Sequence, residues 1–229
     1  MVNITLSKKP KGATVIEGFP GFGLVGPIVT EYLIDHLETE LIGQFEYDEL
    51  PATIAIHEGK VVNPMAVHYS KKYNIIILHT ILSVKGKEWV FAREITKMLE
   101  ELKAKEVICL EGVNVMEETK SEIFSYGNPE FVNLGAQEMK ESIIMGVSAA
   151  MLLRAKNVSC LFALAQSQLP DSKAAANIIT FLDKYLDLNV DPEPLIEQAT
   201  KFEDKLKNLM QQAQSAESEA DKKNLSYLG

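Results

Sequence analysis

The chain has 229 residues, of which 46% are hydrophobic, so it is long enough for one large domain or two small ones with a full apolar core. Its formal net charge is -9, and no basic stripe with interleaved aromatic residues occurs, so we expect no nucleic-acid partner. No apolar run has the length of a membrane span, and the first residues lack the apolar core of a signal peptide. These features predict a soluble, cytoplasmic protein without a membrane partner.

The first predicted elements surround a glycine-rich turn. Residues 13–17 form a short β-rich apolar run, and the sequence GFPGFGLVG follows at residues 18–26. A helix is expected from about residue 26 to 37, with Pro27 in its first turn, where a missing N–H costs nothing. Residues 41–47 have the pattern of a second strand.

The next segment is decisive for the fold class. Four short strands are predicted, over residues 53–57, 61–62, 65–69 and 73–79. The pieces EGK, NP and SKK that separate them leave no room for helices. Such short connections indicate antiparallel hairpins.

Helices and strands then alternate. Residues 85–105 predict an amphipathic helix with an apolar stripe of Trp89, Ile95, Met98, Leu99 and Leu102. The later predicted elements are a central parallel strand at 106–110, weaker strands at 121–126 and 131–134, a helix at 146–157, a buried strand at 158–165 and a helix capped by Asp171 or Ser172.

This order predicts an α/β fold over residues 1–190: a three-layer α/β/α sandwich with a mixed sheet and an antiparallel hairpin insertion. Residues 191–229 form a second predicted region, a C-terminal heptad-patterned helix with a flexible tail. Its apolar positions are Leu195, Ala199, Phe202, Leu206, Leu209, Ala213, Ala216 and Ala220.

The glycine turn matches the G-x-G-x-x-G pattern of dinucleotide-binding proteins, and acids that could bind a ribose follow at Glu40, Glu46 and Asp48. However, hairpins take the place of the helix that should follow the second strand. Pro20 also removes a donor where a phosphate needs one. We therefore expect no nucleotide or other cofactor, and a fold-defining turn formed by Gly18, Pro20, Gly21, Gly23 and Gly26.

Other residue types give weaker signals of chemistry. His36, His57, His68 and His79 have no metal-ligand spacing, so no metal site is expected. Cys109 and Cys160 lie in apolar runs and predict buried thiols without a disulfide. Glu111 follows the predicted central strand, at the end where α/β proteins bind ligands, and is the candidate acid of a ligand site.

Three segments carry a resemblance to a known family: GFPGFGLVG at 18–26, GVSAAMLLRAKNVSCLFALA at 146–165 and PDSKAAANIITFLDKYLDLNVD at 170–191. Together with the charged helix that follows, they resemble the proteasome-assembly-chaperone family, which includes the second eukaryotic proteasome assembly chaperone and archaeal homologues. The resemblance spans about residues 13–210. It implies a non-enzymatic, homo-oligomeric binding protein whose partners are proteasome α-subunits or the 20S core.

The resemblance also implies a role for the C-terminus, because proteasome activators can end in a hydrophobic–Tyr–any-residue motif. Here Leu228 is next to last and Tyr227 precedes it, so the motif is displaced by one residue. The candidate partner-binding residues are Phe202, Leu206, Leu209, Tyr227, Leu228 and Gly229. The alternative is an enzyme that uses residues 18–26 for an anionic or nucleotide ligand, as an oxidoreductase or as a ligase of the ATP-grasp type, the older label of this family.

Overall fold

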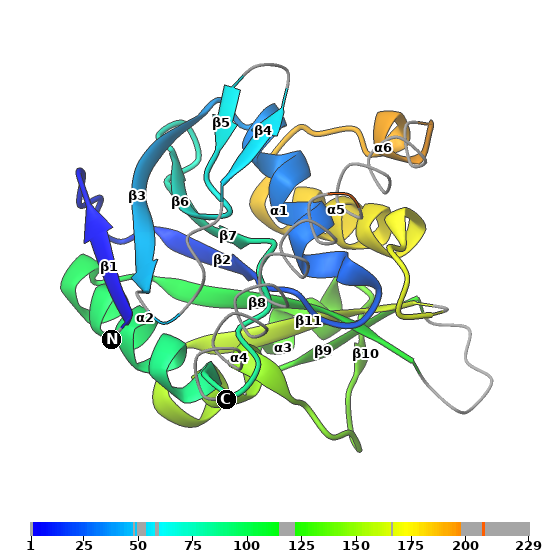
Figure 1. Cartoon of the computed structure of the whole chain (residues 1–229). Helices are drawn as coiled ribbons and strands as arrows, with labels where there is room; N and C mark the ends of the chain where they lie inside the picture. Colours follow the sequence, from blue (N-terminus) through cyan, green and yellow to red (C-terminus); the bar gives the residue numbers. More distant parts are fainter. Residues whose placement is uncertain are drawn as a thin grey trace, which may run out of the picture.

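A computed structural model describes residues 2–47, 49, 54–57, 60–114, 122–165, 167–197 and 208 (Figure 1). The strands are β1 (Val2–Leu6), β2 (Thr14–Gly18), β3 (Thr39–Tyr47), β4 (Ala55–His57), β5 (Lys60–Val62), β6 (Met65–Ser70), β7 (Ile75–Thr80), β8 (Glu106–Val113), β9 (Ile123–Tyr126), β10 (Gln137–Glu138) and β11 (Val158–Leu164). The helices are the 3-10 turn η1 (Phe22–Leu24) and α1 (Val25–His36), α2 (Glu88–Leu102), α3 (Pro129–Asn133), α4 (Gly146–Arg154), α5 (Ser172–Leu186) and α6 (Glu193–Glu197). None of the helices in these ranges has the length and apolar character of a membrane span.

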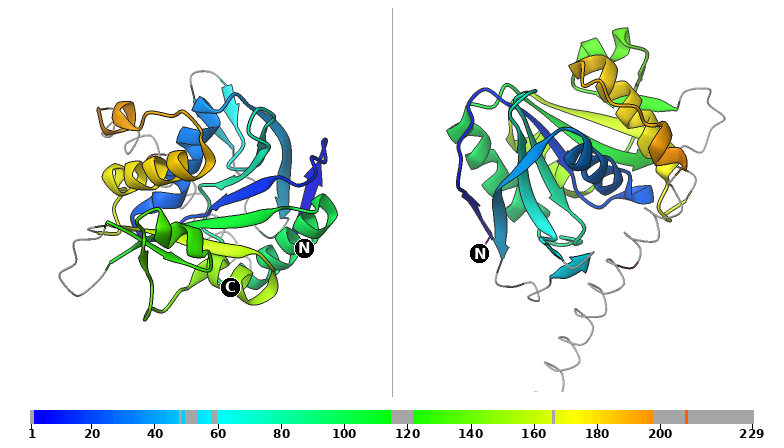
Figure 2. Two further views of the ribbon diagram at one scale, coloured as in Figure 1. Left: turned by 180° about the vertical axis from the view of Figure 1, so that it is seen from behind. Right: turned by 90° about the horizontal axis from the view of Figure 1, so that it is seen from above.

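Nine strands form one mixed sheet in the order β1-β3-β6-β7-β2-β8-β11-β9-β10, and β4 and β5 pair separately as an antiparallel hairpin. The centre, from β7 through β2 and β8 to β11, is parallel, whereas β1, β3 and β6 pair antiparallel. Helices cover both faces of the sheet, with α1 and α5 packed together on one face and α2 and α4 on the other (Figures 1 and 2). The predicted three-layer α/β/α sandwich is confirmed.

The central strands are buried on both faces, which explains their continuous apolar sequences. Every residue of β2 and β7 is buried. Side chains that point to opposite faces of a strand therefore enter two different cores, one beneath α1 and α5 and the other beneath α2 and α4. Glu17 on β2 departs from this apolar pattern, because it is an acidic residue whose side chain is nonetheless buried.

Two sequence predictions are wrong in this part of the chain. Residues 131–134 were expected to be a strand, but they belong to α3 and the turn after it. Asn128 caps this helix by accepting a hydrogen bond from the Glu130 N–H at 3.0 Å, and Pro129 occupies its first position, so a start signal outweighs the apolar run. Trp89 was expected in the apolar stripe of α2 but is 51% exposed.

The C-terminal part of the domain packs beside α1. Asp171 caps α5, as predicted, by accepting a hydrogen bond from the Ala174 N–H at 2.9 Å. The Tyr32 hydroxyl donates to the Asp191 carbonyl at 2.5 Å, and Leu195 on α6 is buried in the same core. The chain therefore still packs on the domain beyond the expected boundary at residue 190.

Candidate functional site

The glycine turn connects β2 to α1 across the edge where the central parallel strands end. Gly23 has φ +63, in the left-handed region that favours glycine. Gly18 lies so close to α1 that a Cβ there would be 2.4 Å from Thr30 Cγ2 and 2.5 Å from the Gly26 carbonyl oxygen. The turn therefore holds the start of α1 directly against the sheet, at a separation that a larger residue would prevent.

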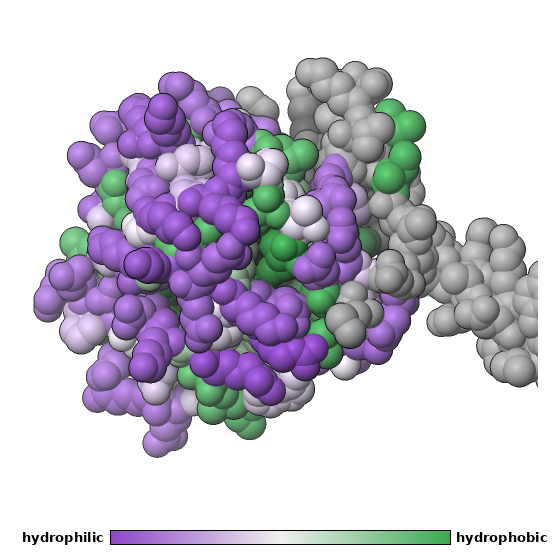
Figure 3. Space-filling view, turned by 90° about the vertical axis from the view of Figure 1, so that its left-hand side faces the viewer, coloured by the Kyte–Doolittle hydropathy of each residue, from purple (hydrophilic) through white to green (hydrophobic). Residues whose placement is uncertain are grey.

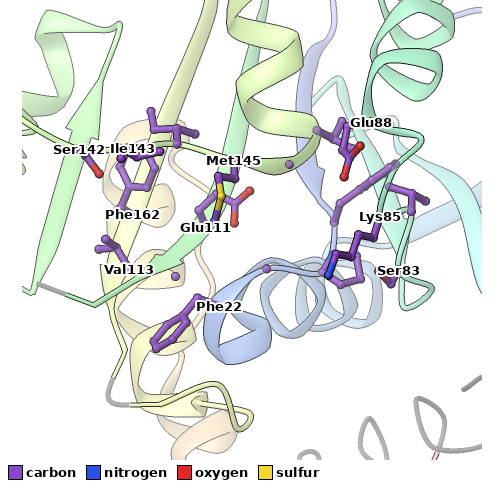
Figure 4. A pocket seen from close by; sticks show the side chains of 18 of the residues that line it. Phe22, Ser83, Lys85, Glu88, Glu111, Val113, Ser142, Ile143, Met145 and Phe162 are labelled. Carbon is purple, nitrogen blue, oxygen red and sulfur yellow. The ribbon is translucent and has the colours of Figure 1, made fainter.

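A pocket of about 550 Å³ opens beside this turn (Figure 4). It lies at the carboxyl ends of β2 and β8 and next to the first residues of α2 and α4. Its apolar wall consists of Phe19, Phe22, Val84, Val113, Ile143, Ile144, Met145, Val147 and Phe162. Its polar side chains are Ser83, Lys85, Glu88, Glu111, Asn114 and Ser142. Ligand sites of open α/β sheets occur at this end of the strands.

Glu111 lies in this pocket and is joined to Glu17 through one hydroxyl group. Ser148 Oγ on α4 is 2.7 Å from Glu111 Oε1 and 3.2 Å from Glu17 Oε2. Glu17 also accepts a hydrogen bond from the Phe19 N–H at 3.1 Å. We call Glu17 and Glu111 the acid pair. On the pocket side, a Cβ at Gly21 would be 2.1 Å from Glu111 Oε2, so this glycine makes room for the carboxyl group.

The acid pair retains protons to an unusually high pH. Burial raises the pKa of Glu111 to about 8, and the charge of Glu17 contributes to the increase. Burial also raises the pKa of Glu17 to about 6, although hydrogen bonds from Cys109, Phe19 and Ser148 oppose this shift. Because Ser148 has one hydroxyl hydrogen, it donates to only one acid at a time, and a protonated carboxyl completes the other contact. Near neutral pH the pair therefore holds a proton.

A second polar cluster lies on the other face of the sheet. His79 Nδ1 is 2.8 Å from Thr30 Oγ1, and His79 Nε2 is 3.2 Å from Glu31 Oε2. Thr30 also donates to the Gly26 carbonyl at 2.9 Å, which links this histidine cluster of Thr30, Glu31 and His79 to the glycine turn. Both Thr30 and His79 are buried. His79 is thus a buried histidine whose two ring nitrogens both contact side chains of α1.

The other candidate ligands give no metal site. In the ranges that the structure describes, no group of three or more His, Cys, Asp or Glu side chains could hold a metal ion. Cys109 and Cys160 are free and buried, as expected, and are register partners on β8 and β11. The candidate partner-binding residues Phe202, Leu206, Leu209, Tyr227, Leu228 and Gly229 all lie outside the described residues.

The structure brings the predicted turn and the predicted acid together. Gly21 of the turn lies directly against the carboxyl group of Glu111. Sequence reasoning missed Glu17 and Ser148. A signal for Glu17 was available, since an acid within the buried run TVIEG must have a special environment. Ser148 had no local signal, because its contact with Glu17 joins residues 131 positions apart.

The fold and the turn together define a class: a three-layer α/β domain whose central strand passes through a glycine-rich turn into its first helix. The model of the PAC2 family matches residues 15–210, and the chain belongs to this family.

Solved structures and a curated relative agree with this assignment. Pyrococcus furiosus PbaA, described as an archaeal homolog of proteasome-assembly chaperone, is 31% identical with a TM-score of 0.84, covering 95% of this chain and 100% of that one. Pyrococcus furiosus PbaB, described as an archaeal proteasome activator, is 19% identical with a TM-score of 0.69, covering 91% of this chain and 98% of that one, and shows the shared fold alone. Protein MJ0106 of Methanocaldococcus jannaschii is 28% identical over 209 residues, which cover 86% of this chain and 85% of the relative.

Proposed function

We propose that this chain is a non-enzymatic, homo-oligomeric binding protein whose partners are proteasome α-subunits or the 20S core particle in the cytoplasm. The observation that carries the proposal is the match to PbaA, which extends over nearly all of both chains at 31% identity. The chain belongs to the PAC2 family, and the similar protein PbaA is described as a homolog of proteasome-assembly chaperone. Both observations support proteasome subunits as the class of partner.

The antiparallel part of the molecule offers a candidate contact surface. Leu41 on β3, Ile54 before β4 and Ile56 on β4 are exposed, although all three are large apolar residues. The side of the molecule that carries β1 is mainly hydrophilic, with hydrophobic residues in smaller groups between the polar ones (Figure 3). Exposed large apolar side chains in this antiparallel part of the molecule favour contact with another protein chain. We place the second contact surface in the C-terminal segment with Phe202, Leu206 and Leu209.

Surface plasmon resonance on immobilised α-subunits and 20S core tests the proposal with the full chain. We expect saturable binding that weakens at least tenfold in Ile56→Asp, because a buried aspartate at an interface is costly. Leu169→Asp is the matched control, since Leu169 is also an exposed apolar residue but lies in the loop before α5. Absence of binding to both immobilised partners would contradict the proposal.

Removing Tyr227–Gly229 tests the tail in the same assay. A free carboxylate with one aromatic and one aliphatic side chain fits a pocket that contains a lysine, and several tails on one oligomer increase the effective concentration. We expect weaker binding to the 20S core. Unchanged affinities would assign the proteasome contact to the folded domain.

Light scattering tests the oligomer. The truncation that separates the C-terminal segment should follow Glu197, because an earlier cut would remove the buried Leu195. We expect the truncated protein to fold but to form a smaller oligomer, because the cut removes the apolar heptad positions from Ala199 to Ala220. An unchanged oligomer would show that the C-terminal segment does not contribute to assembly.

The enzymatic alternative makes a different prediction for nucleotides and phosphate. Pro20 provides no N–H in the turn, and Glu111 is the acid that an anion would meet. We therefore expect no thermal shift with NAD, ATP or inorganic phosphate. Saturable low-micromolar binding of one of these ligands by calorimetry would favour the enzyme.

A further inference from the structure

We propose that the pocket beside the glycine turn is a binding site for a small organic ammonium ion, with the ammonium group on Glu111 and an apolar body against the aromatic and aliphatic wall. This site is separate from the proposed proteasome contact, and neither depends on the other.

The arrangement of charge favours a cation. Glu88 and Glu111 line the pocket, Glu17 lies behind Glu111, and Lys85 is the one basic side chain among the described lining residues. Lys85 and Glu88 come from the same side, near the start of α2, whereas Glu111 stands between them and the apolar side with Phe162 (Figure 4). The acids therefore outnumber the bases, and Glu111 is the carboxyl group with direct access to the apolar part of the pocket.

The acid pair also lacks a positively charged partner among the described side chains packed around it. The polar groups around Glu111 are Glu17 on β2, Cys109 beside it on β8 with Cys160 on β11, Ser148 on α4, and Lys85 and Glu88 across the pocket. None of the groups on β2, β8, β11 and α4 is basic. In the free protein a proton balances the pair, because burial holds the pKa of Glu111 near 8. An ammonium ion at the same carboxyl replaces that proton and forms a charge-assisted hydrogen bond.

The apolar wall suits a ligand with a hydrocarbon or aromatic body. The volume of about 550 Å³ is in the range of small-molecule sites, roughly 300–1,000 Å³. Phe19 and Phe22 flank the turn, and aromatic rings attract cations as well as apolar groups. Ile143 and Met145 line the pocket although they are 87% and 77% exposed, so they provide apolar side chains at its mouth that a bound ligand would cover.

Isothermal titration calorimetry of the full chain with phenethylammonium tests the proposal, with 2-phenylethanol and 3-phenylpropanoate as neutral and anionic probes of similar body. We expect the ammonium ion to bind at least tenfold more tightly than either probe. Binding should release a proton, which titrations in two buffers of different ionisation enthalpy measure. Its Kd should fall about tenfold per pH unit as the pH rises toward 8, because Glu111 must lose its proton.

Variants distinguish Glu111 from the general charge of the protein. Glu111→Gln keeps the shape and the hydrogen bond from Ser148, and we expect at least a tenfold loss of phenethylammonium affinity. Glu130→Gln makes the same substitution at an exposed residue of α3 and should stay within twofold of the parent. Equal binding of 2-phenylethanol, absence of proton release, or unchanged affinity in Glu111→Gln would overturn the proposal. The wild-type pH dependence decides the question even if a variant fails to fold.

An ammonium group also occurs on lysine side chains, so one further probe identifies the source. Nα-acetyl-lysine amide presents its amine on a peptide backbone. We expect it to bind more weakly than phenethylammonium, because it lacks a body that fits the apolar wall. Tighter binding would overturn the assignment to a small free amine.

Discussion

The histidine cluster of Thr30, Glu31 and His79 and the acid pair of Glu17 and Glu111 lie on opposite faces of the sheet at the same end of the central strands. His79 is the register partner of Gly18, and Glu17 precedes Gly18, so the alternation along β2 directs the two clusters into different cores. The histidine cluster brings an acid and a base together and is shielded from solvent at Thr30 and His79. The acid pair brings two acids together at the edge of a pocket.

This difference separates a structural cluster from a binding cluster. In the histidine cluster each polar group has a complementary protein partner, and Thr30 fastens the arrangement to the glycine turn. In the acid pair no side chain on β2, β8 or α4 contributes a positive charge, so a bound proton neutralises one of the two carboxyl groups. A buried site that lacks its own counter-charge is suited to take one from a ligand. Substitutions that act on one cluster and leave the other intact test this distinction.

The largest expected loss of stability comes from Gly18→Ala. The new Cβ would meet Thr30 and the backbone of Gly26 at 2.4 and 2.5 Å, and backbone cannot move aside cheaply. We expect a loss of about 3 kcal/mol in the free energy of unfolding, equivalent to roughly 6–12 °C in Tm. Gly86→Ala is the control, because Gly86 has φ +81 but open space around it, and it measures backbone strain alone, about 1 kcal/mol. Equal losses in the two variants would show that the close approach at Gly18 is not important.

A pH-dependent gain is expected from Glu111→Gln. The folded-state pKa of Glu111 lies above its unfolded value, so the folded protein holds an extra proton between about pH 4.5 and 8. The contribution of this group to stability is present below pH 4.5 and declines as the pH rises through that window. Each pKa unit corresponds to about 1.4 kcal/mol, so removing the ionisable group should raise the free energy of unfolding by as much as about 5 kcal/mol at pH 8.5, and by less than about 1 kcal/mol at pH 5.

Thermal unfolding of both proteins across this pH range is the measurement. The expected increase in Tm is as much as about 10–20 °C at pH 8.5, and only a few degrees at pH 5. A variant that loses stability equally at both pH values would contradict the protonated state of Glu111.

The smallest stability effect is expected from Gly21→Ala. The new Cβ would meet Glu111 Oε2 at 2.1 Å, but this is the far end of a side chain that can rotate. Gly21 has φ -137, which any residue adopts. We expect a change below about 1 kcal/mol in stability together with a roughly tenfold loss of phenethylammonium binding, because the carboxyl group leaves its position. Unchanged binding would show that the position of the Glu111 carboxyl group does not determine the affinity for phenethylammonium.

Much of the fold could be predicted because its signals are local. The sequences of β2, β7, β8 and β11 are apolar at successive positions, whereas a strand with only one buried face would alternate apolar and polar residues. The short connections between the predicted strands indicated the hairpins. The errors have physical causes as well. Trp89 fits the helical stripe by spacing, but Arg154 lies over its ring, with Cζ 5.0 Å from the centroid, and provides a partner outside the core. The sequence analysis did not predict β1 and β10. Both are edge strands, and their pairing depends on partners elsewhere in the chain.

The site could be predicted only in part. The turn and Glu111 were recognisable, because one follows a strand with a known type of sequence and the other ends a central strand. That they form one site depends on β2 and β8 being neighbours. The bridge from Glu17 through Ser148 to Glu111 depends further on the packing of α4 against the sheet, which no spacing in the sequence indicates.

Carbon-13 NMR titration of the glutamate carboxyl groups tests most directly whether the acid pair holds a proton that a ligand replaces. For the free protein we expect the pair to titrate in two steps, with midpoints near pH 6 and near pH 8. Saturating phenethylammonium should lower the upper midpoint, because the bound cation stabilises the ionised carboxyl. Two midpoints near the ordinary value of 4.5, or an upper midpoint that phenethylammonium leaves unchanged, would contradict this description of the site.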